Sequence, residues 1–137
     1  MKTLFTLALL SAAILLGGCS NAEKYAANQA ATSSWLKSSG GRPDMRISGA
    51  WEALETGWGG AGRFVQTGNQ ITGALGNYTV RGVVNGTTAY LAFESSGWTY
   101  YTAVLKKRGN TLGGFYSGEV PFSARDQGSL TLRKLAD

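Results

Sequence analysis

Short β-rich segments separated by glycine-containing turns follow one another from residue 47 to the end of the chain. Their regular spacing is typical of an all-β sandwich or barrel, and no helical periodicity interrupts them. We expect eight strands, at residues 47–54, 63–66, 70–75, 78–84, 87–94, 98–106, 111–117 and 129–134. Most connections are tight, so consecutive strands should pair antiparallel.

Eight strands joined by hairpins form an up-and-down meander, and closing the meander into a barrel removes its exposed edges. The sequence therefore predicts an all-β, eight-stranded antiparallel barrel over residues 46–137. A barrel of this size is just wide enough to be filled by side chains or to hold one small ligand. Asn85-Gly86 is the strongest turn signal, because a two-residue type I′ turn needs positive φ at both positions.

Alternation along the strands assigns one set of side chains to the barrel interior. Its larger members are candidate ligand-lining residues: Trp51, Phe64, Tyr78, Leu91 and Phe93. The same residues are also the most economical core, so a filled interior and a hollow one stay open as alternatives. Inward glycines at 49, 73 and 82 either relieve crowding or leave space. Segments 98–106 and 111–117 are apolar on both faces, which leaves their parity undecided.

Three aromatic residues lie at or beside expected turns. Trp58 sits in a Gly-Trp-Gly-Gly run, and Trp98 follows Gly97 and precedes Tyr100 by two residues. Large aromatics at glycine-rich turns can anchor a protein partner or gate a cavity. They can equally fold over the barrel end as a lid on the core. We take Trp58, Trp98 and Tyr100 as candidate partner-contact residues.

The N-terminus has the layout of an export signal. Lys2 supplies the positive charge, residues 4–16 are almost entirely apolar, and this run is too short to span a bilayer comfortably. The motif Leu16-Gly17-Gly18-Cys19-Ser20 that follows resembles the lipobox of bacterial lipoproteins. The resemblance implies removal of residues 1–18, diacylglyceryl transfer to Cys19, and a further fatty-acyl chain such as palmitate. In a bacterium with two membranes, Ser20 after the cysteine implies sorting to the outer membrane, with the domain facing the periplasm or the cell exterior.

Cys19 is the only cysteine, so the folded domain contains no disulfide. The alternative is a plain secretory signal cut elsewhere, which would leave an unexplained free thiol. We expect residues 19–45 to form a tether, with a loop-forming stretch at 38–44. Residues 22–36 could form a short helix that docks through Trp35, or they could be disordered.

The first strand carries Ile47-Ser48-Gly49-Ala50-Trp51, which contains Gly-x-Trp and resembles the signature of the calycins, the lipocalin and avidin-like barrels. In calycins this tryptophan closes one barrel end and a basic residue of the last strand packs across it, which here implies Lys134. The hairpin at 68–75 is similar to one of avidins, but the biotin-contacting strands have no counterpart. Residues 95–100 distantly resemble a loop of periplasmic lysozyme inhibitors.

Side chains that support catalysis are scarce. The chain has no histidine, and lipidation would consume its only thiol, which removes the usual bases and nucleophiles. The eight carboxylates are dispersed, and the nearest pair, Glu52 and Glu55, is expected to be solvated. No cluster of His, Cys or carboxylate side chains suggests a metal. The sequence predicts no enzyme, metal site or cofactor.

The net charge of +5 comes from scattered basic residues, and the one cluster, Lys106-Lys107-Arg108, falls at an expected turn. It lacks the interleaved aromatics of nucleic-acid modules, so we expect no nucleic-acid partner. Two functions remain: a membrane-anchored carrier that holds a small apolar ligand in the barrel, or a non-enzymatic envelope protein, inhibitor-like or an assembly partner, acting through its loops.

Overall fold

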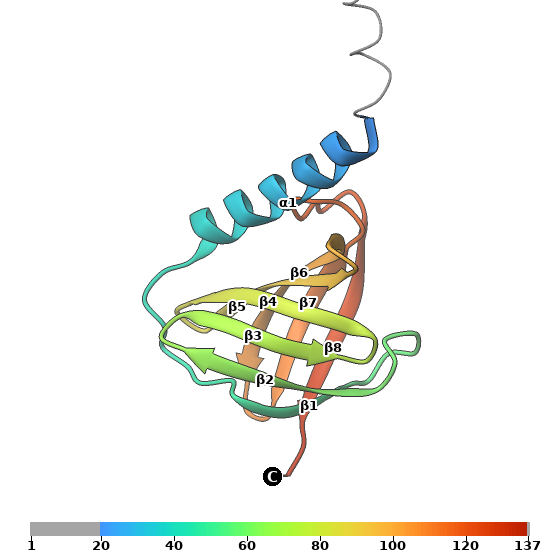
Figure 1. Ribbon diagram of the computed structural model, residues 1–137. Coiled ribbons are helices and arrows are strands. Elements are labelled where there is room, and N and C mark those ends of the chain that lie inside the picture. Colours follow the sequence, from blue (N-terminus) through green and yellow to red (C-terminus); the bar gives the residue numbers. More distant parts are fainter. Residues whose placement is uncertain (1–19, 137) are drawn as a thin grey trace, which may run out of the picture.

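The computed structural model describes residues 20–136, which form one helix followed by a β-barrel (Figure 1). Helix α1 spans Ser20–Ser39. The strands are β1 (Gly49–Ala53), β2 (Ala61–Thr67), β3 (Gln70–Leu75), β4 (Tyr78–Asn85), β5 (Thr88–Ser95), β6 (Trp98–Arg108), β7 (Thr111–Ser117) and β8 (Gln127–Lys134). All eight expected strands are present, and their ends lie within two residues of the predicted ones.

Each strand pairs antiparallel with the next, and β1 also pairs with β8, so the meander closes into a barrel as predicted. Trp51 lies directly opposite Lys134 in the β1–β8 ladder. Cross-strand partners share a face of the sheet, so Lys134 is on the tryptophan side, as the Gly-x-Trp motif implied. The closed eight-stranded barrel is compatible with a calycin-like fold.

The tight turns differ from the sequence expectation at one hairpin. Asn85 pairs with Thr88 in the β4–β5 ladder, so the turn is Gly86-Thr87 and not Asn85-Gly86. Only Gly86 has a positive φ there, of 60°. The prediction was wrong by one residue because Asn85 extends the strand. The turn with positive φ at both positions is instead Ser96-Gly97, between β5 and β6.

Inward glycines relieve crowding in this small barrel. A Cβ on Gly73 would lie 2.1 Å from the carbonyl oxygen of Arg63, and one on Gly82 would lie 2.4 Å from that of Tyr90. Both distances are far below van der Waals contact, so a side chain at either position would push neighbouring strands apart. The glycines therefore permit close strand approach, which favours relief of crowding over the alternative that these glycines leave interior space.

Burial shows which side chains of β6 and β7 point into the barrel. Tyr101, Ala103 and Leu105 face inward from β6, and Leu112 and Tyr116 face inward from β7, with Ala103 directly opposite Tyr116. A register shift lies between Phe93 and Glu94, which pair with Tyr101 and Thr99, so Tyr100 has no partner on β5. Such a bulge puts two consecutive residues on one face, and it turns Tyr100 outward with an exposure of 47%.

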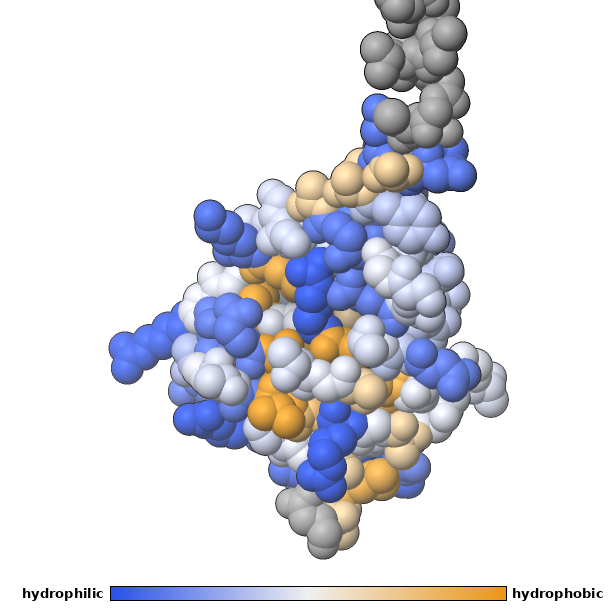
Figure 2. All heavy atoms as spheres, in the orientation of Figure 1, coloured by the Kyte–Doolittle hydropathy of each residue, from blue (hydrophilic) through white to orange (hydrophobic). Residues whose placement is uncertain are grey.

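Helix α1 lies on the outside of the barrel, over β4, β5 and β6 (Figure 1). The space-filling view in the same orientation shows the helix directly against the barrel surface (Figure 2). The β6–β7 ladder ends at Thr102, so Thr99 has no strand partner on that side. The carboxamide of Asn28 takes the place of a strand: it accepts a hydrogen bond from the Thr99 amide (2.8 Å) and donates one to the Thr99 carbonyl (3.1 Å). The helix thus satisfies a strand edge that would otherwise be open.

A polar network continues this contact along the helix. Arg81 on β4 pairs with Glu94 on β5 at 2.6 Å, and both side chains bond the carboxamide of Gln29. The Thr32 hydroxyl donates to the Thr99 hydroxyl at 2.7 Å. Farther along, Leu36 is buried against Val83 and Ala92. Of the two alternatives for the tether, the structure therefore has the docked helix, and it extends beyond the predicted residues 22–36 at both ends.

Candidate functional site

The candidate ligand-lining residues form the centre of the barrel. Trp51, Leu91 and Phe93 are completely buried, and Phe64 is 1% exposed. These four belong to one continuous apolar cluster, together with the inward residues of the other strands. The indole nitrogen of Trp51 donates a hydrogen bond to the carbonyl of Ile47 at 2.9 Å, which satisfies its one polar atom. The interior at these positions is therefore packed with side chains.

Trp58 closes the barrel end formed by the β1–β2, β3–β4, β5–β6 and β7–β8 connections. It is 6% exposed, and its ring centroid lies 4.9 Å from that of Phe93, 5.0 Å from Tyr116 and 5.3 Å from Tyr101. Tyr78 is a fourth aromatic neighbour, at 6.1 Å. Four aromatic neighbours at such distances are typical of a packed core. The glycines around Trp58 let its loop fold inward, so Trp58 is a lid on the core and is not displayed to a partner.

Tyr78, the fifth candidate lining residue, stands at the rim of this end and not at the centre. With Tyr101 and Tyr116 it surrounds a hollow of about 170 Å³, and Trp58 and the loop residues Thr56 and Gly57 complete the lining. Burial raises the pKa of the Tyr78 hydroxyl above its usual 10.0, and the neighbouring Tyr101 raises it further. The phenol therefore stays neutral at physiological pH, as a hydrogen-bonding group of the rim.

A groove on the outer wall was not anticipated from the sequence. It measures about 310 Å³ and runs over β6 and β7 to the β7–β8 loop, lined by Val104, Lys106, Arg108, Gly113, Gly114, Phe115, Phe122 and Gln127. Phe115 is 46% exposed in it. The groove thus combines an apolar floor with two basic side chains from β6.

Gly113 creates part of this groove. It pairs with Lys106 on β6 and so lies on the outer face. A Cβ at Gly113 would meet no atom within 4 Å, and the backbone φ of Gly113 lies outside the positive range that favours glycine. By contrast, a Cβ on Gly114 would lie 2.1 Å from the Val104 carbonyl, so Gly114 is needed for packing. The fold therefore does not need glycine at position 113, which lines the groove together with Phe115.

Trp98 and Tyr100, the other candidate partner contacts, lie at the surface beside α1. Tyr25 of the helix packs edge-on against Trp98, with ring centroids 5.2 Å apart. A hollow of about 270 Å³ lies between them, lined by Asn21, Lys24, Tyr25, Trp98 and Tyr100. The structure therefore separates the three candidates, since Trp58 is core while Trp98 and Tyr100 are accessible.

The carboxylates Glu52 and Glu55, close in sequence, have separate structural roles. Glu52 pairs with Arg133 across the β1–β8 ladder, and Glu55 accepts a hydrogen bond from the Thr131 amide at 2.8 Å. Within residues 20–136, no three His, Cys, Asp or Glu side chains come together as a metal site would require.

Cys19 and the predicted signal sequence, residues 1–18, lie outside the described residues. Among residues 20–136, no helix is long and apolar enough to cross a membrane. Comparison of the chain with models of protein families, with curated proteins and with solved structures finds no match.

Proposed function

We propose that this chain is a lipid-anchored protein of the bacterial envelope that binds a partner through the outside of its barrel and catalyses no reaction. The observation that carries this proposal is the packed interior: Trp51, Phe64, Leu91 and Phe93 occupy the space that a carrier would keep for its ligand. A rigid, filled barrel suits a scaffold that presents surface features, as inhibitors and assembly partners do.

The anchor is supported by the lipobox-like motif around Cys19 and by the position of the helix. Several acyl chains, each contributing about 0.8 kcal/mol per buried methylene, would hold the protein on the membrane permanently. The described part of helix α1 starts at Ser20, the residue after Cys19, so the helix and the barrel on which it docks would lie close to the anchor. Ser20 favours the outer membrane, with the barrel in the periplasm or on the cell surface.

The groove over Phe115 is the surface best suited to a partner. Its apolar floor would take an aliphatic or aromatic side chain, and Lys106 and Arg108 would pair with carboxylates beside it. Buried aromatic anchors surrounded by charged rims dominate the energetics of protein interfaces. The partner we expect is an envelope protein with an extended segment that combines an apolar anchor with acidic residues.

The small-ligand alternative has one specific feature in its favour, the hollow between Trp58 and the three rim tyrosines. At about 170 Å³ this hollow is smaller than the roughly 300 Å³ at which ligand pockets usually begin. A ligand there would be small and polar, since tyrosine hydroxyls surround it. Carriage of an apolar molecule therefore stays a prediction, and it is less favoured than partner binding.

Photocrosslinking in living cells tests the partner-binding proposal. We would place a photoreactive phenylalanine at Phe115 and, as a control, at Val65, an outward residue of β2 that is 52% exposed. We expect one discrete crosslinked protein from position 115, lost when Gly113→Val fills the groove, and none from position 65. No adduct at 115, or equal adducts at both positions, would contradict the proposed groove.

A further inference from the structure

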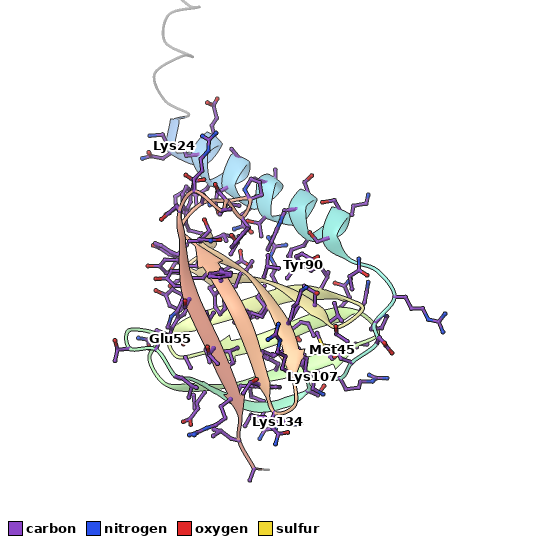
Figure 3. All side chains as sticks on the ribbon, turned by 180° about the vertical axis from the view of Figure 1, so that it is seen from behind. Lys24, Met45, Glu55, Tyr90, Lys107 and Lys134 are labelled. Carbon is purple, nitrogen blue, oxygen red and sulfur yellow. The ribbon has the colours of Figure 1, made fainter. Side chains whose placement is uncertain are left out.

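The surface around Trp98 lies at the start of α1, next to the proposed anchor. Figure 3 shows Lys24 at this end of the molecule, whereas Lys107 and Lys134 lie at the opposite end. The surface, which we call the aromatic seat, consists of Lys24, Tyr25, Trp98 and Tyr100. Tyr25 and Tyr100 are exposed by 49% and 47%, and they belong to the few large hydrophobic side chains that are exposed in the described part of the chain.

The fold holds the aromatic seat in place. Lys24 and Tyr25 precede Asn28 by four and three residues, so they lie on the same stripe of α1 that Asn28 docks against the barrel. Tyr25 contacts the Trp98 ring, and the β-bulge turns Tyr100 outward beside them. Side chains from the helix and from the β5–β6 hairpin thus meet in one fixed surface.

Distance along the helix relates the aromatic seat to the membrane. Tyr25 lies five residues after Ser20, or about 8 Å along the axis at 1.5 Å per residue. The headgroup layer of one leaflet is about 5–8 Å thick, half the difference between the whole bilayer and its hydrocarbon core. Cys19 precedes Ser20 by one residue, at most about 4 Å, so a lipid on Cys19 would keep Tyr25 within about 11 Å of the anchored residue. A helix inclined to the membrane normal would then bring Tyr25 to the depth of the headgroups.

The chemistry of the aromatic seat fits that depth. Tryptophan and tyrosine concentrate at membrane interfaces, where their apolar rings and polar atoms are both accommodated. Lys24 lines the hollow between the rings and can donate to a lipid phosphate. Glu23 is exposed on the same turn, so the contact should not depend on anionic lipids.

We propose that the aromatic seat rests in the headgroup layer of the membrane that carries the anchor, and so fixes the orientation of the barrel. This inference relies on the proposed lipid anchor at Cys19. The contact holds the start of α1 at the membrane. The groove runs from the β7–β8 loop at that end of the barrel toward Arg108 at the opposite end, so its part around Lys106 and Arg108 would stay accessible to a partner. Trp35, ten residues beyond Tyr25, lies about 15 Å farther along the helix and stays clear of the lipid.

Trp35 provides a matched control, because it also packs edge-on against a barrel tyrosine, Tyr90, at a centroid distance of 5.9 Å. The full chain would be processed in a bacterial host and purified from its membranes. It would then be reconstituted into vesicles of phosphatidylethanolamine and phosphatidylglycerol that contain a lipid with a nitroxide on its headgroup. Quenching of tryptophan fluorescence by this lipid identifies the indole nearest the headgroups.

We expect the nitroxide lipid to quench the wild-type protein, with the quenching lost in Trp98→Phe and kept in Trp35→Phe. Tyr100→Ala should also weaken the quenching, while Phe115→Ala, a change at an equally exposed ring outside the aromatic seat, should not. Replacing phosphatidylglycerol by a zwitterionic lipid should leave the signal unchanged.

Two results would overturn the inference in different ways. If the purified chain lacks acyl mass and does not float with the vesicles, the lipid anchor is wrong and the inference fails with it. If the chain is acylated and floats, but Trp98→Phe keeps the quenching or Trp35→Phe loses it, the anchor stands and the proposed orientation is wrong. Circular dichroism of each variant would verify that the barrel is intact.

Discussion

Replacing Trp58 by alanine tests whether the end of the barrel is a closed core or a movable lid. The indole is 6% exposed and contacts Phe93 and three tyrosines. If these contacts belong to the core, removing the ring should destabilise the whole domain. If Trp58 is a lid that opens readily, the free energy of unfolding of the domain should change little.

The expected loss follows from the buried area. A tryptophan or other large aromatic side chain removes roughly 150–250 Å² from water, which at about 25 cal/mol per Å² corresponds to about 4–6 kcal/mol. Aromatic-to-alanine substitutions in cores cost about 3–5 kcal/mol. We expect a loss in this range for Trp58→Ala, because its glycine-rich loop can collapse only partly into the space.

Urea unfolding monitored by circular dichroism measures this loss, with Trp35→Ala as the control. Trp35 is partly exposed and makes one aromatic contact, so its removal should cost about 1–2 kcal/mol. Added indole should restore part of the stability of Trp58→Ala, because a preformed apolar cavity binds small aromatic molecules. A loss below about 1 kcal/mol for Trp58→Ala, without indole rescue, would refute the packed lid.

Three further predictions concern the helix, the rim and the groove. Asn28→Ala should lower the free energy of unfolding by about 1–3 kcal/mol and speed hydrogen exchange at the Thr99 amide, which loses its acceptor; unchanged exchange would show that the helix is not held there. The folded-state pKa of Tyr78 is raised, so the unfolded chain loses the phenol proton first as pH rises past about 10, and the free energy of unfolding falls. Tyr78→Phe should remove this part of the fall above about pH 10 and leave the pH dependence of stability below it unchanged, as urea unfolding at a series of pH values would show. Gly113→Val should leave the free energy of unfolding unchanged or raise it by up to about 1 kcal/mol, because the added side chain meets open space on a strand; a clear loss in urea unfolding would refute a groove without a structural role.

The barrel was predictable because its determinants are local. Strand alternation placed Trp51, Phe64 and Phe93 inside, and the tight turns left sequential pairing as the simplest topology. The turn at Asn85-Gly86 was misplaced by one residue because the cross-strand pairing of Asn85 with Thr88 outweighs the local preference. Parity in β6 and β7 could not be predicted, since both faces carry apolar residues and the bulge at Tyr100 shifts the register.

The candidate site was less predictable because it depends on contacts between distant residues. Asn28 and Thr99 are separated by 71 positions, and a polar helix with few bulky residues gives no sign of its docking partner. The burial of Trp58 depends on four aromatic rings from other strands, so the sequence alone left two alternatives: a lid on the core or a residue that contacts a partner. The outer groove had one signal, the pair Gly113-Gly114 in a strand, of which only Gly114 is explained by packing.

Native mass spectrometry of the chain purified from bacterial membranes tests the central claim, that the barrel is filled by its own side chains. The account predicts the mass of the mature chain with its acyl modification and no further bound molecule, before and after extraction with organic solvent. A stoichiometric apolar adduct that extraction removes would contradict it, and would show that Trp51, Phe64 and Phe93 line a ligand site.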